Sequence, residues 1–275
     1  MSLPTRILGQ TGVQVTIVGL GGEGVLRTFG YEREALEVIK AALEAGLTYF
    51  ETARAYSGSE VYLGKGLGRE RHKVFLSSKS HARSRREAEE HLSLTLGNLR
   101  TDYLDLWQVH DVRSTRDLEE LAAPGGALET FRWAREEGYT RFVGVTGHHN
   151  PEVLRRALEL YPFDTVLLPV NPAEPRYRSF LPVAQEAEAR GLGVIGMKVL
   201  ARGLVAQLDL APIQDYLHYA LSQPVSLVVV GCDQPQHVWE LAEAARNFKP
   251  LPPEAQRRLE EAVAPFARGL MYYKP

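Results

Sequence analysis

The chain has 275 residues, 44% hydrophobic and 24% charged, with a formal net charge of −2. This is the composition of a globular protein, and it excludes the basic field that draws proteins to nucleic acids or anionic lipids. A single cysteine, Cys232, excludes an internal disulfide and a multi-cysteine metal centre. Because it also lacks a signal-like start and a run of about 18 apolar residues, we expect a cytoplasmic protein with no nucleic-acid or membrane partner.

Short apolar runs alternate with helical patterns along the chain, after an N-terminal hairpin over 6–8 and 14–15 with its turn at 9–12. The predicted strands are 16–20, 47–50, 74–78, 103–109, 142–146, 165–170, 193–199 and 226–230. The predicted helices are 32–45, 60–66, 85–99, 126–137, 151–160, 181–190, 211–222 and 235–247, with an extra C-terminal helix over 253–267. Gly46 marks one helix end, and Asn150 followed by Pro151 marks one helix start.

Strands buried on both faces read as continuous apolar runs, as in TVLLPV and SLVVV. The repeated strand–helix unit fits a closed (β/α)₈ TIM barrel better than an open doubly wound sheet, which usually has fewer strands. No linker or break in composition interrupts the pattern. We therefore expect a single domain over residues 1–275, in the α/β class, with an N-terminal β-hairpin and an extra C-terminal helix.

Three motifs are weaker than they first look. Gly19 to Gly24 matches GxGxxG, but no helix pattern opens at the third glycine to hold a pyrophosphate, so we reject a Rossmann site. The stretch from Gly58 to Lys65 only loosely resembles a phosphate loop. The histidines include no HxH or HExxH pair, and the adjacent His148 and His149 are not expected to face one metal together, so no metal site is predicted.

Four polar residues follow three successive predicted strands: Glu51, Tyr56, Lys79 and His110. In a parallel barrel, chemistry takes place where strands end. A carboxylate, a phenol, an ammonium and an imidazole can together transfer a proton. Taken singly, each has a plain alternative as a packing tyrosine, a rim lysine, a core histidine or a turn cap. Their common placement favours a catalytic group.

The stretch GLTYFETARAYSGSEVYLGKGLG, with VFLSSK and DLWQVH after it, resembles the aldo-keto reductase family, as does the opening TRILGQTGVQVTIVGLG. The resemblance implies reduction of an aldehyde or ketone with NADPH, or alternatively NADH, as hydride donor. Tyr56 would protonate the carbonyl oxygen, and Lys79 would lower the pKa of its phenol. Glu51 would pair with Lys79, in place of the family's shorter aspartate, and His110 would orient the carbonyl.

The same resemblance places the cofactor at the exits of other strands. Several positions depart from the family: Thr146-Gly147 replaces Ser-Asn, Leu167 replaces a glutamine, Met197 replaces the stacking tyrosine, and Leu241 replaces an asparagine near adenine. Asn171 is a candidate substitute for the lost glutamine. The expected cofactor-binding residues are Gly21, Thr146, Gly147, Asn171, Met197, Lys198, Arg202, Gly231 and His237.

Two other functions stay open. The departures at the cofactor site would also fit a retired reductase that serves as a binding or regulatory protein. Lys198, at the end of a predicted strand, could instead form a Schiff base in a lyase. The identity of the small-molecule carbonyl substrate, the choice between NADP and NAD, and the oligomeric state do not follow from the sequence.

Overall fold

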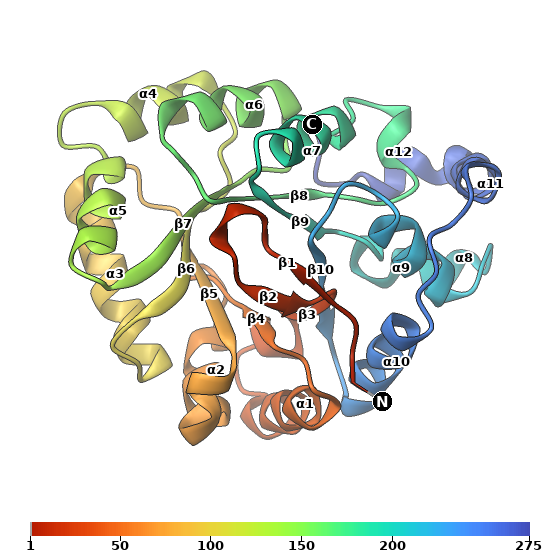
Figure 1. Ribbon diagram of the computed structural model, residues 1–275, viewed down its shortest axis with the longest axis horizontal. Helices are drawn as coiled ribbons and strands as arrows, with labels where there is room; N and C mark the ends of the chain where they lie inside the picture. The colour runs from red at the N-terminus through yellow and green to blue at the C-terminus, as the bar shows by residue number, and fades with distance from the viewer. Residues whose placement is uncertain (1) are drawn as a thin grey trace.

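A closed barrel of parallel strands forms the centre of the computed structural model, which describes residues 2–275 (Figure 1). The barrel strands are β3 (Val18–Gly24), β4 (Tyr49–Glu51), β5 (Phe75–Ser80), β6 (Leu104–Val109), β7 (Thr140–Thr146), β8 (Thr165–Pro169), β9 (Gly193–Met197) and β10 (Leu227–Cys232). Each strand pairs in parallel with the next along the chain, and β10 returns to β3 to close the ring. The predicted (β/α)₈ architecture is confirmed.

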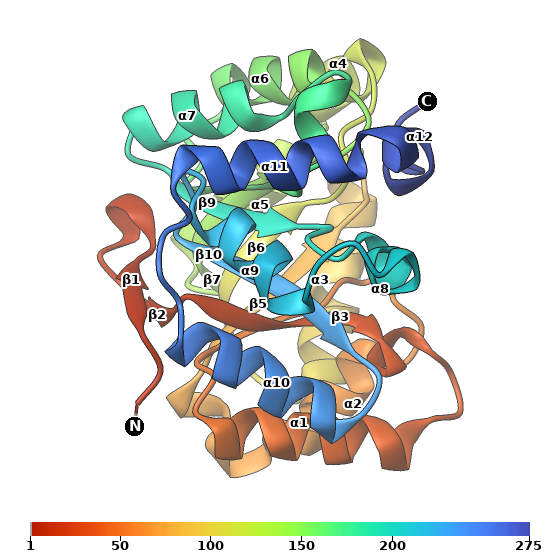
Figure 2. The same ribbon diagram turned by 90° about the vertical axis from the view of Figure 1, so that its right-hand side faces the viewer.

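Helices surround the barrel on its outside (Figures 1 and 2). They are α1 (Glu32–Ala45), α2 (Ser59–Leu67), α3 (Arg85–Leu99), α4 (Thr115–Ala122), α5 (Ala127–Glu136), α6 (Pro151–Leu160), α7 (Leu181–Ala189), α8 (Leu204–Leu208), α9 (Ile213–Leu221), α10 (Pro235–Arg246), α11 (Pro253–Val263) and α12 (Ala267–Leu270). The predicted C-terminal helix is therefore two helices, with a 3₁₀ turn between α11 and α12. Among residues 2–275, no helix has the length and apolar content that crossing a membrane requires.

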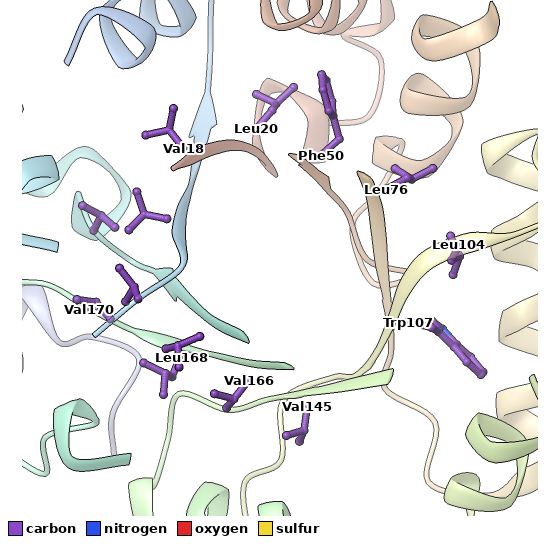
Figure 3. Packing of buried hydrophobic residues seen from close by; sticks show 14 of the residues in the cluster. Val18, Leu20, Phe50, Leu76, Leu104, Trp107, Val145, Val166, Leu168 and Val170 are labelled. Atoms are coloured by element: carbon purple, nitrogen blue, oxygen red, sulfur yellow. The ribbon is translucent and has the colours of Figure 1, made fainter. Parts of the chain in front are cut away.

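The larger core lies between the strands and the helices. Strand residues such as Leu20, Phe50, Leu76 and Trp107 point outward from the barrel toward the helices (Figure 3). Trp107 stacks on Phe131 of α5, with ring centroids 3.9 Å apart. Burial of this apolar surface is the main force that holds each helix on the sheet.

The hairpin of β1 (Thr5–Ile7) and β2 (Gln14–Thr16) lies across one end of the barrel (Figure 1). Its Leu8 and Val15 are fully buried in a second cluster with inward-facing strand residues such as Tyr49 and Leu106. Gly9 has φ +50° and lies so close to the backbone of Gly193 that a Cβ there would overlap it. The hairpin therefore closes the N-terminal end, which leaves chemistry to the C-terminal end.

The glycine-rich segment after the first barrel strand is not a dinucleotide fingerprint. β3 continues to Gly24, and a short 3₁₀ turn at Val25–Arg27 follows it. The first helix begins only at Glu32. The helix N-terminus that a pyrophosphate requires does not open at the third glycine, so rejection of a Rossmann site is consistent with the fold.

Candidate active site

Glu51 and Lys79 form a buried ion pair at the ends of β4 and β5. The Lys79 ammonium lies 2.6 Å from Glu51 Oε1 and donates a second hydrogen bond to the Thr52 carbonyl at 2.9 Å. The Glu51 and Lys79 side chains are 5% and 1% exposed, respectively. The longer glutamate thus reaches the lysine, although Glu51 Oε2 is buried without a hydrogen-bond partner among residues 2–275.

Tyr56 and His110 complete this group. The Lys79 ammonium lies 4.9 Å from the centre of the Tyr56 ring. The Tyr56 and His110 rings meet edge to face, with centroids 5.8 Å apart. His110 Nδ1 is buried and has no hydrogen-bond partner in the part of the chain that the structure describes. All four side chains predicted to act together therefore converge at the C-terminal end of the barrel.

The electrostatics of Tyr56 differ from the expectation. Burial raises the pKa of its phenol well above 10, and the carboxylates of Glu51 and Glu23 raise it further. The expected net lowering of this pKa is not found, because burial and the two carboxylates dominate. Tyr56 is thus a protonated phenol at neutral pH.

His110 is held neutral at the same site. Burial lowers the pKa of its imidazole well below 6.5, and the nearby Lys79 ammonium lowers it further. A neutral imidazole can donate a hydrogen bond from one ring nitrogen and accept one at the other. It can therefore contact a carbonyl oxygen without competing with Tyr56 as the proton donor.

A groove of about 520 Å³ opens beside Tyr56, between the loops that follow β3 and β4. Its walls include Phe29, Arg54 and Tyr56 itself, but not Glu51, Lys79 or His110. Of the four converging side chains, the groove therefore reaches Tyr56 alone.

The expected cofactor residues occupy several strand ends. Gly21 and Gly231 lie side by side where β3 pairs with β10. Thr146 ends β7, and its hydroxyl accepts a hydrogen bond from the Asp111 backbone at 2.9 Å. Gly147 follows it and donates from its backbone to the Leu167 carbonyl at 3.3 Å. These positions lie at the same end of the barrel as Tyr56.

Most of the remaining expected cofactor residues follow β8 or lie at and after the end of β9. Lys198, just after Met197 at the end of β9, and Arg202 lie 3.4 and 3.5 Å from Glu23 Oε1. Asn171 is buried, and its amide donates to the Lys198 carbonyl and the Tyr273 hydroxyl.

His237, on α10, does not join these residues through its hydrogen bonds. It bonds instead to Asp233 and Gln234, which directly precede that helix.

Comparison with known proteins identifies the family of this chain. The aldo/keto reductase family model matches residues 18–216. The chain belongs to the aldo/keto reductase family. Membership places it among the oxidoreductases and confirms the resemblance carried by the sequence motifs.

Two curated relatives of the reductase match about two thirds of their own length. An uncharacterized oxidoreductase, YqkF of Bacillus subtilis, is 24% identical over 220 residues, covering 74% of this chain and 67% of the relative. The L-galactose dehydrogenase of Arabidopsis thaliana is 28% identical over 221 residues, with the same shares.

Two solved structures share the fold. The aldo-keto reductase AKR11C1 from Bacillus halodurans, in its holo form, superposes with a TM-score of 0.79 at 22% identity, covering 94% of this chain and 96% of that one. An aldo-keto reductase from Klebsiella pneumoniae in complex with NADPH gives 0.78 at 22% identity, covering 96% of each chain. At this identity the likeness shows the barrel and not the substrate.

Glu23 lies among the expected cofactor-binding residues, and the sequence did not predict it. It lies near the end of β3 and contacts Lys198, Arg202 and Arg27. Burial alone would raise its pKa, but these cations, with Lys79, lower the pKa of the carboxyl below 4.5. The one sequence feature that could have indicated Glu23 is that it is the single carboxylate in the glycine-rich segment 19–24.

Asp111, His148 and His149 also converge at this end, which corrects the expectation for the two histidines. His148 Nε2 lies 3.2 Å and His149 Nε2 3.7 Å from Asp111 Oδ1. Burial lowers the pKa of His148 to about 4 and also lowers the pKa of His149. Two adjacent residues in a loop can point toward the same atom when the backbone turns between them. Their adjacency in the sequence therefore did not exclude this arrangement.

Proposed function

We propose that this reductase converts an aldehyde or ketone to an alcohol, with NADPH as the preferred hydride donor. The observation that carries the proposal is the Lys79–Glu51 ion pair beneath the Tyr56 ring, with His110 at the edge of that ring. The related Klebsiella reductase, which was solved in complex with NADPH, supports the choice of cofactor.

The residues at the end of β9 suit a dinucleotide. Lys198 and Arg202 supply two cations, and the Arg202 guanidinium lies 5.1 Å from the centre of the Tyr272 ring. Cations of this kind bind phosphate groups through charge-assisted hydrogen bonds. Glu23 now balances their charge, and phosphates would take over that role. When bound, the nicotinamide supplies the hydride.

The protein's own residues handle the proton. His110 would donate a hydrogen bond to the substrate carbonyl oxygen and fix its position. The Tyr56 hydroxyl would give its proton to that oxygen as negative charge develops there, because an alkoxide is a far stronger base than a phenolate. The Lys79 ammonium, held by Glu51, would stabilise the resulting phenolate, which then takes a proton from water.

Replacement of the Tyr56 hydroxyl tests this role. Tyr56→Phe is expected to lower kcat for NADPH-dependent reduction across an aldehyde panel by about 10²–10⁴-fold, the usual contribution of a general acid. NADPH affinity, measured by calorimetry, is expected to change little. Tyr139→Phe, at an exposed ring that packs near Trp133, is the matched control and should keep full activity. Equal kcat in Tyr56→Phe and the wild-type protein would contradict the proposal.

A retired reductase remains the second candidate, because the cofactor groups are already engaged. Glu23 pairs with both cations, and the amide of Asn171 is bonded on each side. Asn171 would have to release its partners to hold a nicotinamide amide. Saturable NADPH binding without turnover of any carbonyl in the panel would favour this candidate.

Schiff-base chemistry at Lys198 is the third candidate. Burial lowers the pKa of its ammonium below 10.5, although the Glu23 carboxylate opposes that change. A lowered pKa increases the fraction of neutral, nucleophilic amine. A mass adduct on Lys198 after treatment with a carbonyl compound and borohydride would support it.

A further inference from the structure

A carboxylate and two imidazoles meet outside the group proposed to transfer the proton. Asp111 follows β6, and His148 and His149 follow β7, so adjacent barrel strands bring them together. One ligand atom from each residue lies within 4.8 Å of the other two. Asp111 is 9% exposed as a residue, and the histidine side chains are 19% and 25% exposed.

Hydrogen bonding among these three residues does not account for their approach. Asp111 Oδ1 and His149 Nε2 are both buried and have no hydrogen-bond partner within residues 2–275. Buried polar atoms without partners are costly and rare in native structures. These two atoms face each other across 3.7 Å, which is too long for a hydrogen bond.

The spacing fits a shared metal ion. An ion bound tetrahedrally at about 2.0–2.2 Å from each ligand holds the donor atoms roughly 3.3–3.6 Å apart. The two separations from Asp111 Oδ1 are 3.2 and 3.7 Å. Small rotations of the side chains would therefore complete the geometry.

Contacts to its second oxygen and to its backbone hold the Asp111 carboxylate in place. Arg113 contacts the other oxygen, Asp111 Oδ2, at 2.7 Å from Nε and 2.6 Å from Nη2. The Asp111 backbone, at φ +57°, is held by the Thr146 hydroxyl. Outer contacts of this kind orient a ligating oxygen, here leaving Oδ1 directed at the imidazoles.

We propose that Asp111, His148 and His149 bind a first-row transition-metal dication, with Zn²⁺ as the expected ion. Two imidazole nitrogens and one carboxylate oxygen suit zinc, whereas Mg²⁺ and Ca²⁺ prefer sites made of oxygen. Three protein ligands leave the fourth position to water or to an oxygen of a small ligand. The site does not depend on the proposed reduction.

Zinc binding to untagged protein tests the site directly. Equilibrium dialysis followed by elemental analysis is expected to give one saturable Zn²⁺ per chain. Asp111→Asn and His149→Gln are each expected to weaken binding by more than the roughly 10–100-fold that loss of an outer contact costs. Asparagine is chosen at position 111 because it tolerates the left-handed backbone. Co²⁺ in place of Zn²⁺ should give the visible absorption of a tetrahedral site, lost in both variants.

A second histidine cluster supplies the control. His81, Glu87 and His91 also lie within ligand distance of one another, but His91 Nδ1 is bonded to the Ser80 hydroxyl. His91→Gln should therefore keep full zinc binding. Lack of saturable binding by the wild-type protein, or equal binding by folded Asp111→Asn, His149→Gln and wild-type proteins, would overturn the proposal. Circular dichroism verifies folding, and His148→Gln replaces a variant that does not fold.

Discussion

At the residue scale, the Glu51–Lys79 pair is both a catalytic candidate and a structural requirement. The Lys79 side chain is 1% exposed, and its hydrogen bonds run to Glu51 and the Thr52 carbonyl. A buried ammonium that loses its counter-charge retains the full cost of leaving water. The stability of this end of the barrel and the proposed chemistry therefore depend on the same contact.

Neutralising Glu51 should destabilise the fold. Glu51→Gln is expected to lower the free energy of unfolding by about 3–5 kcal/mol, because it leaves the Lys79 charge buried and unpaired. Glu51→Asp keeps the charge and should cost less. Urea denaturation at neutral pH measures both, with Glu120→Gln, in the exposed pair with Arg116, as a control expected to lose at most about 1 kcal/mol. Equal losses in Glu51→Gln and Glu120→Gln would contradict this view of the pair.

The sequence predicted correctly that the four candidate residues following apolar strands lie close together. It did not predict Glu23, whose contacts are with Lys198 and Arg202, two cations that follow β9 and are distant in the chain. It also misjudged His148 and His149, because the direction of each ring depends on the loop backbone and on Asp111. No local sequence pattern predicts contacts between residues that are this far apart in the chain.

At the element scale, local signals predicted boundaries well where caps were present. The helices over 32–45, 85–99 and 151–160 agree with α1, α3 and α6 at both ends. Gly46 does take the left-handed conformation, and Asn150 does cap its helix. α4 was missed although Ser114 and Asp117 form a capping box at its start, because its eight residues fall within a strand-to-helix connection.

The C-terminal segment is fixed to the barrel by a second buried ion pair, beyond the reach of sequence patterns. Lys274 Nζ lies 2.8 Å from Glu174 Oε2, with side chains 1% and 0% exposed. Tyr273 donates to the other oxygen of Glu174 at 2.6 Å. Burial raises the pKa of Glu174 above 4.5, against the opposing effect of Lys274. The C-terminal segment with Tyr273 and Lys274 is therefore an ordered part of the structure.

Removal of the lysine charge should destabilise the protein in a pH-dependent manner. Lys274→Met is expected to lower the free energy of unfolding by about 3–5 kcal/mol at pH 7, where Glu174 must stay ionised without its partner or take up a proton. A carboxyl with a raised pKa in the folded state favours folding as the pH falls toward its unfolded value. The loss should therefore shrink at acidic pH.

Denaturation at neutral and acidic pH measures this trend. Lys249→Met, at an exposed lysine, is the control and should lose little stability at either pH. A loss for Lys274→Met that is the same at both pH values would show that Glu174 is not the group left unpaired.

At the scale of the whole molecule, closure joins the first and the last barrel strands, which are far apart in the chain. β10 pairs with β3, so the last barrel strand completes the hydrogen bonding of the first. Leu8 of the hairpin ahead of β3 belongs to one buried cluster with residues of most barrel strands, including Phe75 and Ile195. Because the hairpin and the strands share this cluster, we propose that the described residues 2–275 form one cooperative unit.

One unfolding transition is the expected consequence. Differential scanning calorimetry should give a single peak, with calorimetric and van't Hoff enthalpies that agree. Leu8→Ala removes a fully buried side chain from the closed end and should cost about 2–5 kcal/mol. Because the hairpin cluster includes residues of most barrel strands, the whole peak should move to lower temperature. Leu160→Ala, at a position 40% exposed, should leave it nearly unchanged. A separate early peak in Leu8→Ala would instead make the hairpin an independent unit.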